Sequence, residues 1–211
     1  MNGRLPELLA ARLAEPLPGP MVGSRFESRP RHEWRYDRAP SGARPAAVLL
    51  LLYPVDDRWH VPLTLRPQSM AAHAGQVSLP GGAVEPGESS RQAAVREFHE
   101  ELGPCPGRIE LLGHLSPLYV GESNFLVTPW VGTTAERPPL VANPLEVAEV
   151  LEVPLGHLLD PANFGSHQRK RQGHPYTAPH FLWQNHRIWG ATCMILGELV
   201  TLLEELGTGG D

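Results

Sequence analysis

Residues 81–103 read GGAVEPGESSRQAAVREFHEELG, and this stretch decides what kind of fold the chain adopts. Its glycines and its proline predict a loop up to Ser89, because these residues favour turns and interrupt regular elements. Ser89 with Gln92 three residues on fits a capping box, and Gly103 followed by Pro104 is a stop signal. We therefore predict a helix over residues 90–102 that follows directly on a Gly-Gly loop.

Three glutamates share one face of the predicted helix. Glu97, Glu100 and Glu101 stand at i, i+3 and i+4, which places them within an arc of about 100°. The apolar residues of the helix occupy the adjoining arc and are expected to pack on the core: Ala94, Val95, Phe98 and Leu102. The acidic face therefore lies at the edge of the packed surface rather than on the remote solvent side.

Carboxylates this close repel one another, so at least one pKa must rise unless a cation compensates. Mg²⁺ or Mn²⁺ takes carboxylate, carbonyl and water oxygens, and this face offers such ligands without a His or Cys. Gly81 and Gly82 let the main chain come close and add a carbonyl, while Arg96 and Glu88 are placed to orient the carboxylates. The alternative interpretation is a solvated Glu-rich helix, which is common in proteins.

The spacing of the charged residues resembles the Nudix box. From Gly82 the chain runs through five residues to Glu88, seven more to Arg96-Glu97, then Phe98, His99, Glu100-Glu101, Leu102 and Gly103. Pro104 alone departs from the pattern, where an aliphatic residue is expected. The resemblance implies an α-β-α sandwich of the α/β (α+β) class with a mixed β-sheet, and a pyrophosphohydrolase that cleaves nucleoside diphosphate compounds.

The resemblance also implies roles for single residues. The catalytic set is Glu88, Arg96, Glu97, Glu100 and Glu101. Within it the three helix glutamates bind Mg²⁺ or Mn²⁺ together with the Gly81 carbonyl, and Arg96 and Glu88 position them. The metal would neutralise the diphosphate and orient a water for in-line attack. The general base stays open between Glu97, acting through metal-bound water, and Glu146 in a later loop, for which a plain surface role is the alternative.

Two segments upstream of the box, residues 63–66 (LTLR) and 75–82 (GQVSLPGG), resemble the signature of the coenzyme A pyrophosphatase branch. Three positions differ: Pro67, Ala71 and Leu79 stand where the branch has Ser or Ala, Arg, and Phe. The substrate-binding residues implied by this resemblance are Arg66, Gly75, Gln76 and Gly82. The implied reaction cleaves coenzyme A or acyl-CoA to 3′,5′-ADP and (acyl-)4′-phosphopantetheine.

Two other functions stay open. Without an arginine at position 71 a possible phosphate fork is missing, which keeps ADP-ribose, NADH or a damaged nucleoside triphosphate as alternative substrates. A non-catalytic nucleotide-sensing module on the same fold is the alternative from another class. The complete charged set argues against it, because a chain without catalysis has no physical reason to keep mutually repelling acids.

Cations for a coenzyme A 3′-phosphate would come from Arg66 or from Arg169-Lys170-Arg171. We interpret that run as a solvated loop, with a clamp on the 3′,5′-ADP half as its functional alternative. Trp183 and Trp189 are interpreted as core residues rather than as platforms for adenine.

The rest of the chain alternates strands and helices. Leucines at helical spacing predict a first helix up to Pro16, and a polar, arginine-rich stretch from 21 to 45 reads as a solvated connecting arm. Strands are expected at 46–55, 60–66, 76–79, 109–115, 124–131, 147–153 and 181–189, and helices at 155–159 and at the C-terminus. We expect a helix and arm at 1–45, one Nudix-type domain at 46–206 and a flexible tail at 207–211.

Composition excludes several classes of function. The 211 residues contain 18 basic and 23 acidic side chains, a net charge of −5, so no overall positive field exists to bind nucleic acid. The longest strongly apolar run, 46–53, is far too short to cross a bilayer. Cys105 and Cys193 fit no metal or redox motif and are expected to be reduced thiols of a cytoplasmic protein. The partner is a small nucleotide substrate; the oligomeric state, including a homodimer, stays open.

Overall fold

The computed structural model describes residues 4–20, 24–29, 39–68, 75–105, 107–171 and 173–207. Residues 21–23 and 30–38 of the predicted arm, Ala71 of the upstream signature and residues 208–211 of the predicted tail lie outside these residues. The division into arm, domain and tail stays a prediction.

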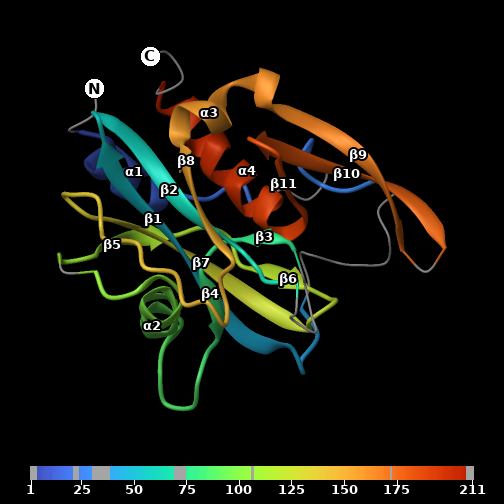
Figure 1. Ribbon diagram of the computed structural model, residues 1–211, viewed down its shortest axis with the longest axis horizontal. Helices are drawn as coiled ribbons and strands as arrows, with labels where there is room; N and C mark the ends of the chain where they lie inside the picture. Colours follow the sequence, from blue (N-terminus) through green and yellow to red (C-terminus); the bar gives the residue numbers. More distant parts are fainter. Residues whose placement is uncertain are drawn as a thin grey trace.

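A mixed sheet forms the centre of the molecule (Figure 1). Its middle strand β1 (Arg44–Val55) pairs in parallel with β7 (Phe125–Thr133) and antiparallel with β2 (Arg58–Leu65). The other members are β3 (Val77–Ser78), β4 (Gly81–Ala83), β5 (Glu110–His114), β6 (Leu118–Val120) and β8 (Glu149–Pro154). The mixed sheet that the sequence predicts is therefore confirmed.

Alternation along β1 divides the core into two layers. Its odd-numbered residues from Ala47 to Tyr53 pack with α2 (Ser90–Leu102), whereas Ala46, Leu50 and Leu52 pack on the opposite face. That opposite face is covered by α1 (Leu5–Leu13), α3 (Leu155–Leu159) and α4 (Gly190–Glu205). Because successive side chains of a strand point to opposite faces, a continuous apolar run becomes the centre of an α-β-α sandwich.

Helix α2 has the predicted bounds. Ser89 accepts from the Gln92 amide at 3.3 Å while the Gln92 side chain accepts from the Ser89 amide at 2.9 Å, so the capping box is present. At the other end, the carbonyls of Glu101 and Leu102 accept from the amides of Asn143 and Val141, each at 2.8 Å. Carbonyls at a helix end lack partners within the helix, so these contacts hold the loop around residue 143 against the end of α2.

A second, three-stranded sheet contains β9 (Phe164–Arg171), β10 (His174–Trp183) and β11 (His186–Trp189). Two expectations are wrong here. Arg169-Lys170-Arg171 is not a loop but the end of β9, and the strand expected at 181–189 is two strands joined by a turn at Gln184, whose φ is +52°. Polar strands carry no apolar alternation, and the turn lacks Gly and Pro, so neither gives a local signal.

Two further expectations need correction. The segment after Gly82 begins as strand β4, which pairs with β1 through Gly81 and Gly82. Within the predicted arm, Phe26 is buried against Phe164 and Phe181 rather than solvated. Both depend on partners far along the chain, which local composition does not reveal. Among the described residues, no helix combines the length and the apolar character needed to cross a membrane.

Candidate active site

The junction of β4 and α2 brings Glu97 and Glu101 beside the Gly-Gly pair. The Gly81 amide donates to Glu101 Oε1 at 3.2 Å. A Cβ at Gly82 would lie 2.5 Å from the Glu97 carboxyl carbon, and one at Gly81 would overlap β1 at Ala47 and Val48. Gly81 therefore requires glycine, because a Cβ would overlap the β1 backbone, whereas a Cβ at Gly82 would displace the Glu97 carboxylate.

Glu101 is the most buried of the predicted acids, with 3% of its surface exposed. Burial raises the pKa of its carboxyl to about 7, against the lowering effects of the Gly81 amide, Arg66 and the Thr64 hydroxyl. Glu101 Oε2 is buried and makes no hydrogen bond within the described part of the protein. A buried carboxylate oxygen without a partner costs free energy and is suited to accept a cation.

Arg96 connects the loop before α2 with the acidic face. Its guanidinium donates to both carboxylate oxygens of Glu88, at 2.7 and 3.2 Å, and to the Ala83 carbonyl at 3.0 Å. Nη1 donates to Glu97 Oε1 and to Glu100 Oε2, each at 2.9 Å. These bonds raise the pKa of Arg96 and lower that of Glu88. Arg96 therefore contacts three carboxylates at once. Its role in positioning them for catalysis stays a prediction.

Glu97 and Glu100 have different surroundings. The Glu97 side chain is 14% exposed and burial raises the pKa of its carboxyl, whereas the Glu100 side chain is 50% exposed. Glu146 contributes to the raised pKa of both Glu97 and Glu101, so the later loop places a fourth carboxylate near the site. Asn143 donates to Glu146 Oε1 at 3.1 Å and orients it.

The donor set fits a hard divalent cation. Glu97 and Glu101 present carboxylate oxygens beside a glycine backbone, one of those oxygens has no partner, and Gly82 leaves space that a Cβ would fill. In the present arrangement no three acidic, histidine or cysteine side chains of the described residues stand together as an ion-binding group. The Arg96 guanidinium instead neutralises Glu97 and Glu100. The metal-ligand assignments stay predictions.

The two halves of the upstream signature meet beside Glu101. The Arg66 amide donates to the Gln76 carbonyl at 3.0 Å, and the Gly75 amide donates to the Arg66 carbonyl at 3.1 Å. Arg66 lies close enough to lower the pKa of Glu101, and its Nε is buried without a partner among the described residues. Of the predicted substrate-binding residues, Arg66 and Gly82 thus border the acidic helix face, and Gly75 and Gln76 are joined to Arg66 by backbone hydrogen bonds. Their roles stay predictions.

Sequence reasoning missed two polar residues at this site, Thr64 and Asn143. Thr64 is fully buried and its hydroxyl lowers the pKa of Glu101, while Asn143 connects the end of α2 with Glu146. A signal existed for Thr64, because in strand alternation it shares the face of Arg66. For Asn143 the stretch 143–147, which resembles the coenzyme A branch, was a signal, but its contact with a helix about forty residues earlier is visible only in the structure.

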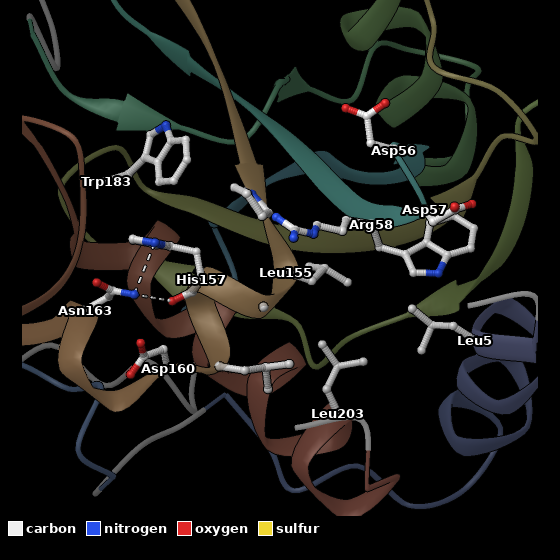
Figure 2. A pocket seen from close by; sticks show the side chains of 14 residues that line it. Leu5, Asp56, Asp57, Arg58, Leu155, His157, Asp160, Asn163, Trp183 and Leu203 are labelled. Atoms are coloured by element: carbon white, nitrogen blue, oxygen red, sulfur yellow. Dashed lines mark hydrogen bonds between the residues drawn. The ribbon is translucent and has the colours of Figure 1, made fainter. Parts of the chain in front are cut away.

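A pocket of about 710 Å³ opens elsewhere, beside the turn between β1 and β2 and next to α3 (Figure 2). Its lining includes Trp59, His157 and Trp183 but none of the predicted site residues. Asn163 donates to His157 Nδ1 at 3.1 Å, which leaves Nε2 as the donor to the Leu182 carbonyl at 2.6 Å. Because both ring nitrogens are engaged, His157 has a structural role there.

The sandwich fold and the acidic helix beneath a glycine strand define a hydrolase of the Nudix type. A family model described as the NUDIX domain matches residues 43–180. Nudix hydrolase 3 of Caenorhabditis elegans is 34% identical over 74% of this chain and 72% of that protein. The uncharacterized Nudix hydrolase NudL of Photorhabdus laumondii is 37% identical over 65% of this chain and 73% of that protein.

Among solved structures, a MutT/nudix family protein from Enterococcus faecalis is 16% identical and covers 84% of this chain and 66% of its own, with a TM-score of 0.48. From the family model and the curated relatives, the chain belongs to the Nudix family. It is therefore a hydrolase that acts on pyrophosphate bonds, in a family that generally uses divalent metal ions.

Proposed function

We propose that this protein hydrolyses the diphosphate of coenzyme A or acyl-CoA to 3′,5′-ADP and (acyl-)4′-phosphopantetheine. The observation that carries the proposal is the meeting of residues 63–66 and 75–82 at the acidic helix. These segments, which resemble the coenzyme A branch, pair as β2 and β3 through Thr64 and Ser78. Arg66 then lies beside Glu101, where a substrate diphosphate would bring negative charge.

The residues placed to hold Mg²⁺ or Mn²⁺ are Glu97, Glu101, Glu100 and the Gly81 carbonyl. When bound, the ion would supply charge neutralisation at the diphosphate and lower the pKa of a water nucleophile. Arg96 and Glu88 keep the carboxylates in orientation, and Gly82 leaves them room. Arg66 is placed to donate to a phosphate oxygen, because its Nε has no partner in the described protein.

Glu146 is the candidate for the group that takes a proton from the attacking water. It stands near both Glu97 and Glu101 and is oriented by Asn143. This placement favours Glu146 as base over the plain surface role, while Glu97 is the remaining candidate.

Another nucleoside diphosphate compound, such as ADP-ribose or NADH, is the second candidate substrate, and the differences at Pro67 and Ala71 favour it. A non-catalytic sensing role fits the site less well, because Arg96 orients three acids that such a role does not require. The proposed site of action is the cytoplasm, in keeping with two free cysteines, Cys105 and Cys193.

The test is one panel of substrates assayed with Mg²⁺ and with Mn²⁺, in which kcat/KM is measured for coenzyme A, acetyl-CoA, ADP-ribose and NADH. Product masses identify the bond that is cleaved. We expect coenzyme A or its thioester to be preferred, with 3′,5′-ADP as product. A higher kcat/KM for ADP-ribose or NADH would replace the proposed substrate, and turnover of none by wild type would favour the sensing role.

A further inference from the structure

A second cavity, of about 570 Å³, lies between the turn before β3 and the β9–β10–β11 sheet. The lining residues that matter here are Gly75, Val77, His167, Arg169, Arg187 and Trp189. Its size is within the range of sites for nucleotide-sized ligands. Gly75 belongs to the predicted substrate-binding set, so this cavity adjoins the proposed active site.

The cavity is cationic. No Asp or Glu belongs to its described lining, and neither Arg169 nor Arg187 forms an ion pair with a carboxylate among the described residues. Arg171, two residues beyond Arg169 on β9, instead forms an ion pair with Glu122, with 3.4 Å between Nη2 and Oε1. Within the part of the chain that the structure describes, two guanidinium groups are therefore left without counter-ions on one wall of a concave site, which favours an anionic ligand.

Arg169 is held in place by an aromatic ring. Its guanidinium carbon lies 3.9 Å from the centroid of the Trp189 ring. This contact restricts the long side chain while its N–H groups stay available, so less conformational entropy is lost when a ligand binds.

The histidines at the cavity wall can donate hydrogen bonds through their ring nitrogens, and they bring no negative charge that would neutralise the arginines. His167 and His180 face one another with 3.2 Å between their Nδ1 atoms, and His167 Nε2 is buried without a partner in the described protein. Burial is the main cause that lowers the pKa of both rings; His180, Arg187 and Arg169 lower that of His167 further, and Arg187 lowers that of His180. The remaining histidine of the lining, His186, contacts Glu149 at 3.4 Å. The wall therefore offers nitrogen donors and positive charge.

One short strand separates this cavity from the acidic site. Val77 lines the cavity, and its neighbour Ser78 pairs with Thr64, whose hydroxyl reaches Glu101. The Gly75 amide, on the cavity side, donates to the Arg66 carbonyl, on the acidic side. A substrate with a diphosphate and a further phosphate at one end could place its diphosphate at the acidic site, on one side of β3, and its further phosphate in the cavity, on the other side.

We propose that this cavity binds the 3′-phosphate of the 3′,5′-ADP half of coenzyme A, and that Arg169 and Arg187 determine specificity for it. The inference rests on the proposed function for its choice of ligand. Lys170 is the matched control, because it neighbours Arg169 on β9 but is not part of the cavity lining.

The first experiment measures binding without divalent metal by calorimetry, so it does not depend on turnover. The probes are adenosine 3′,5′-bisphosphate and 5′-AMP, which differ by the phosphate in question. Wild type and Lys170→Met should bind the bisphosphate at least about tenfold more tightly than 5′-AMP, and Arg169→Met and Arg187→Met should lose most of that preference. Equal binding of the two probes by wild type would overturn the inference.

The second experiment compares kcat/KM for coenzyme A and dephospho-CoA. Arg169→Met and Arg187→Met should lower the value for coenzyme A about tenfold, through KM, and change dephospho-CoA by less than about twofold. If coenzyme A is cleaved but the substitutions lower kcat/KM equally for both substrates, the inference is wrong and the proposed function stands. If coenzyme A is not cleaved while the binding preference depends on the two arginines, the proposed function fails and the cavity assignment stands. Both arginines are exposed, so unchanged melting temperatures serve as the folding control.

Discussion

Glu101 accepts a hydrogen bond from the Gly81 amide, with 3.2 Å between the nitrogen and Oε1. This bond joins the strand that carries the glycine pair to the helix that carries the acids. It leaves the second carboxylate oxygen, Oε2, buried and without a partner among the described residues. The orientation of Glu101 is thus set by the backbone, before any ligand contributes.

The first prediction concerns Glu97 and Glu101. Replacing either by Gln keeps the shape but removes the negative charge that a metal ligand needs, so we expect each change to lower kcat/KM by at least about 100-fold. Hydrolysis of coenzyme A with saturating Mg²⁺ measures the effect. Glu110→Gln, an exposed acid at the start of β5, should leave the rate unchanged. Rates close to wild type in both site variants would refute the assignment.

The second prediction tests the space at Gly82. A Cβ there would lie 2.5 Å from the Glu97 carboxyl carbon, so Gly82→Ala must displace that carboxylate. We expect a loss of at least about tenfold in kcat, since small misplacements of catalytic groups are costly. Gly156→Ala is the control, because nothing lies within 4 Å of its Cβ position. Full activity of Gly82→Ala would show that Glu97 has no fixed position in catalysis.

The third prediction concerns Glu146. If it takes the proton from the attacking water, Glu146→Gln should lower kcat by about 100-fold while Mn²⁺ binding, measured by calorimetry, stays close to wild type. Glu149→Gln, an exposed acid three residues on, is the matched control. An unchanged kcat for Glu146→Gln would move the role of base to Glu97.

The fourth prediction is a pH dependence of stability from Glu198. This acid is 1% exposed on α4 and accepts from the amide and the hydroxyl of Ser116, at 3.1 and 2.6 Å. Burial raises the pKa of its carboxyl in spite of these bonds. The folded protein therefore holds this proton more tightly than the unfolded chain. The contribution to stability is complete below the ordinary carboxyl pKa and is lost as pH rises through the raised one, with a slope of at most about 1.4 kcal/mol per pH unit.

Urea unfolding of the metal-free protein between pH 4 and 8 measures this dependence. Glu198→Gln has no proton to lose, so its free energy of unfolding should fall less steeply over that range than that of wild type. Glu204→Gln, which is exposed on the same helix, should follow the wild-type curve. Parallel curves for wild type and Glu198→Gln would contradict the raised pKa.

The acidic helix could be predicted from sequence because its information is local. The capping box of Ser89 and Gln92, the stop at Gly103 and the i, i+3, i+4 spacing of the glutamates all lie within one helix, and the structure has the predicted bounds. The apolar run of β1 predicted a strand buried on both faces for the same reason. The end of β9 could not be predicted, because Arg169-Lys170-Arg171 has no apolar face and its pairing partner is supplied by β10.

By itself, the sequence determined the family, the set of charged residues and the helix that presents them, because spacing along a helix converts directly into one face. Only the tertiary structure decided that Glu101 is buried beneath Gly81, that Arg96 lies among three acids and that Glu146 joins them through Asn143. It also decided that Gly75, Arg169 and Trp189 line one cavity. These relationships join residues far apart in the chain, and their geometry depends on how strands pair and layers pack, which no short stretch of sequence specifies.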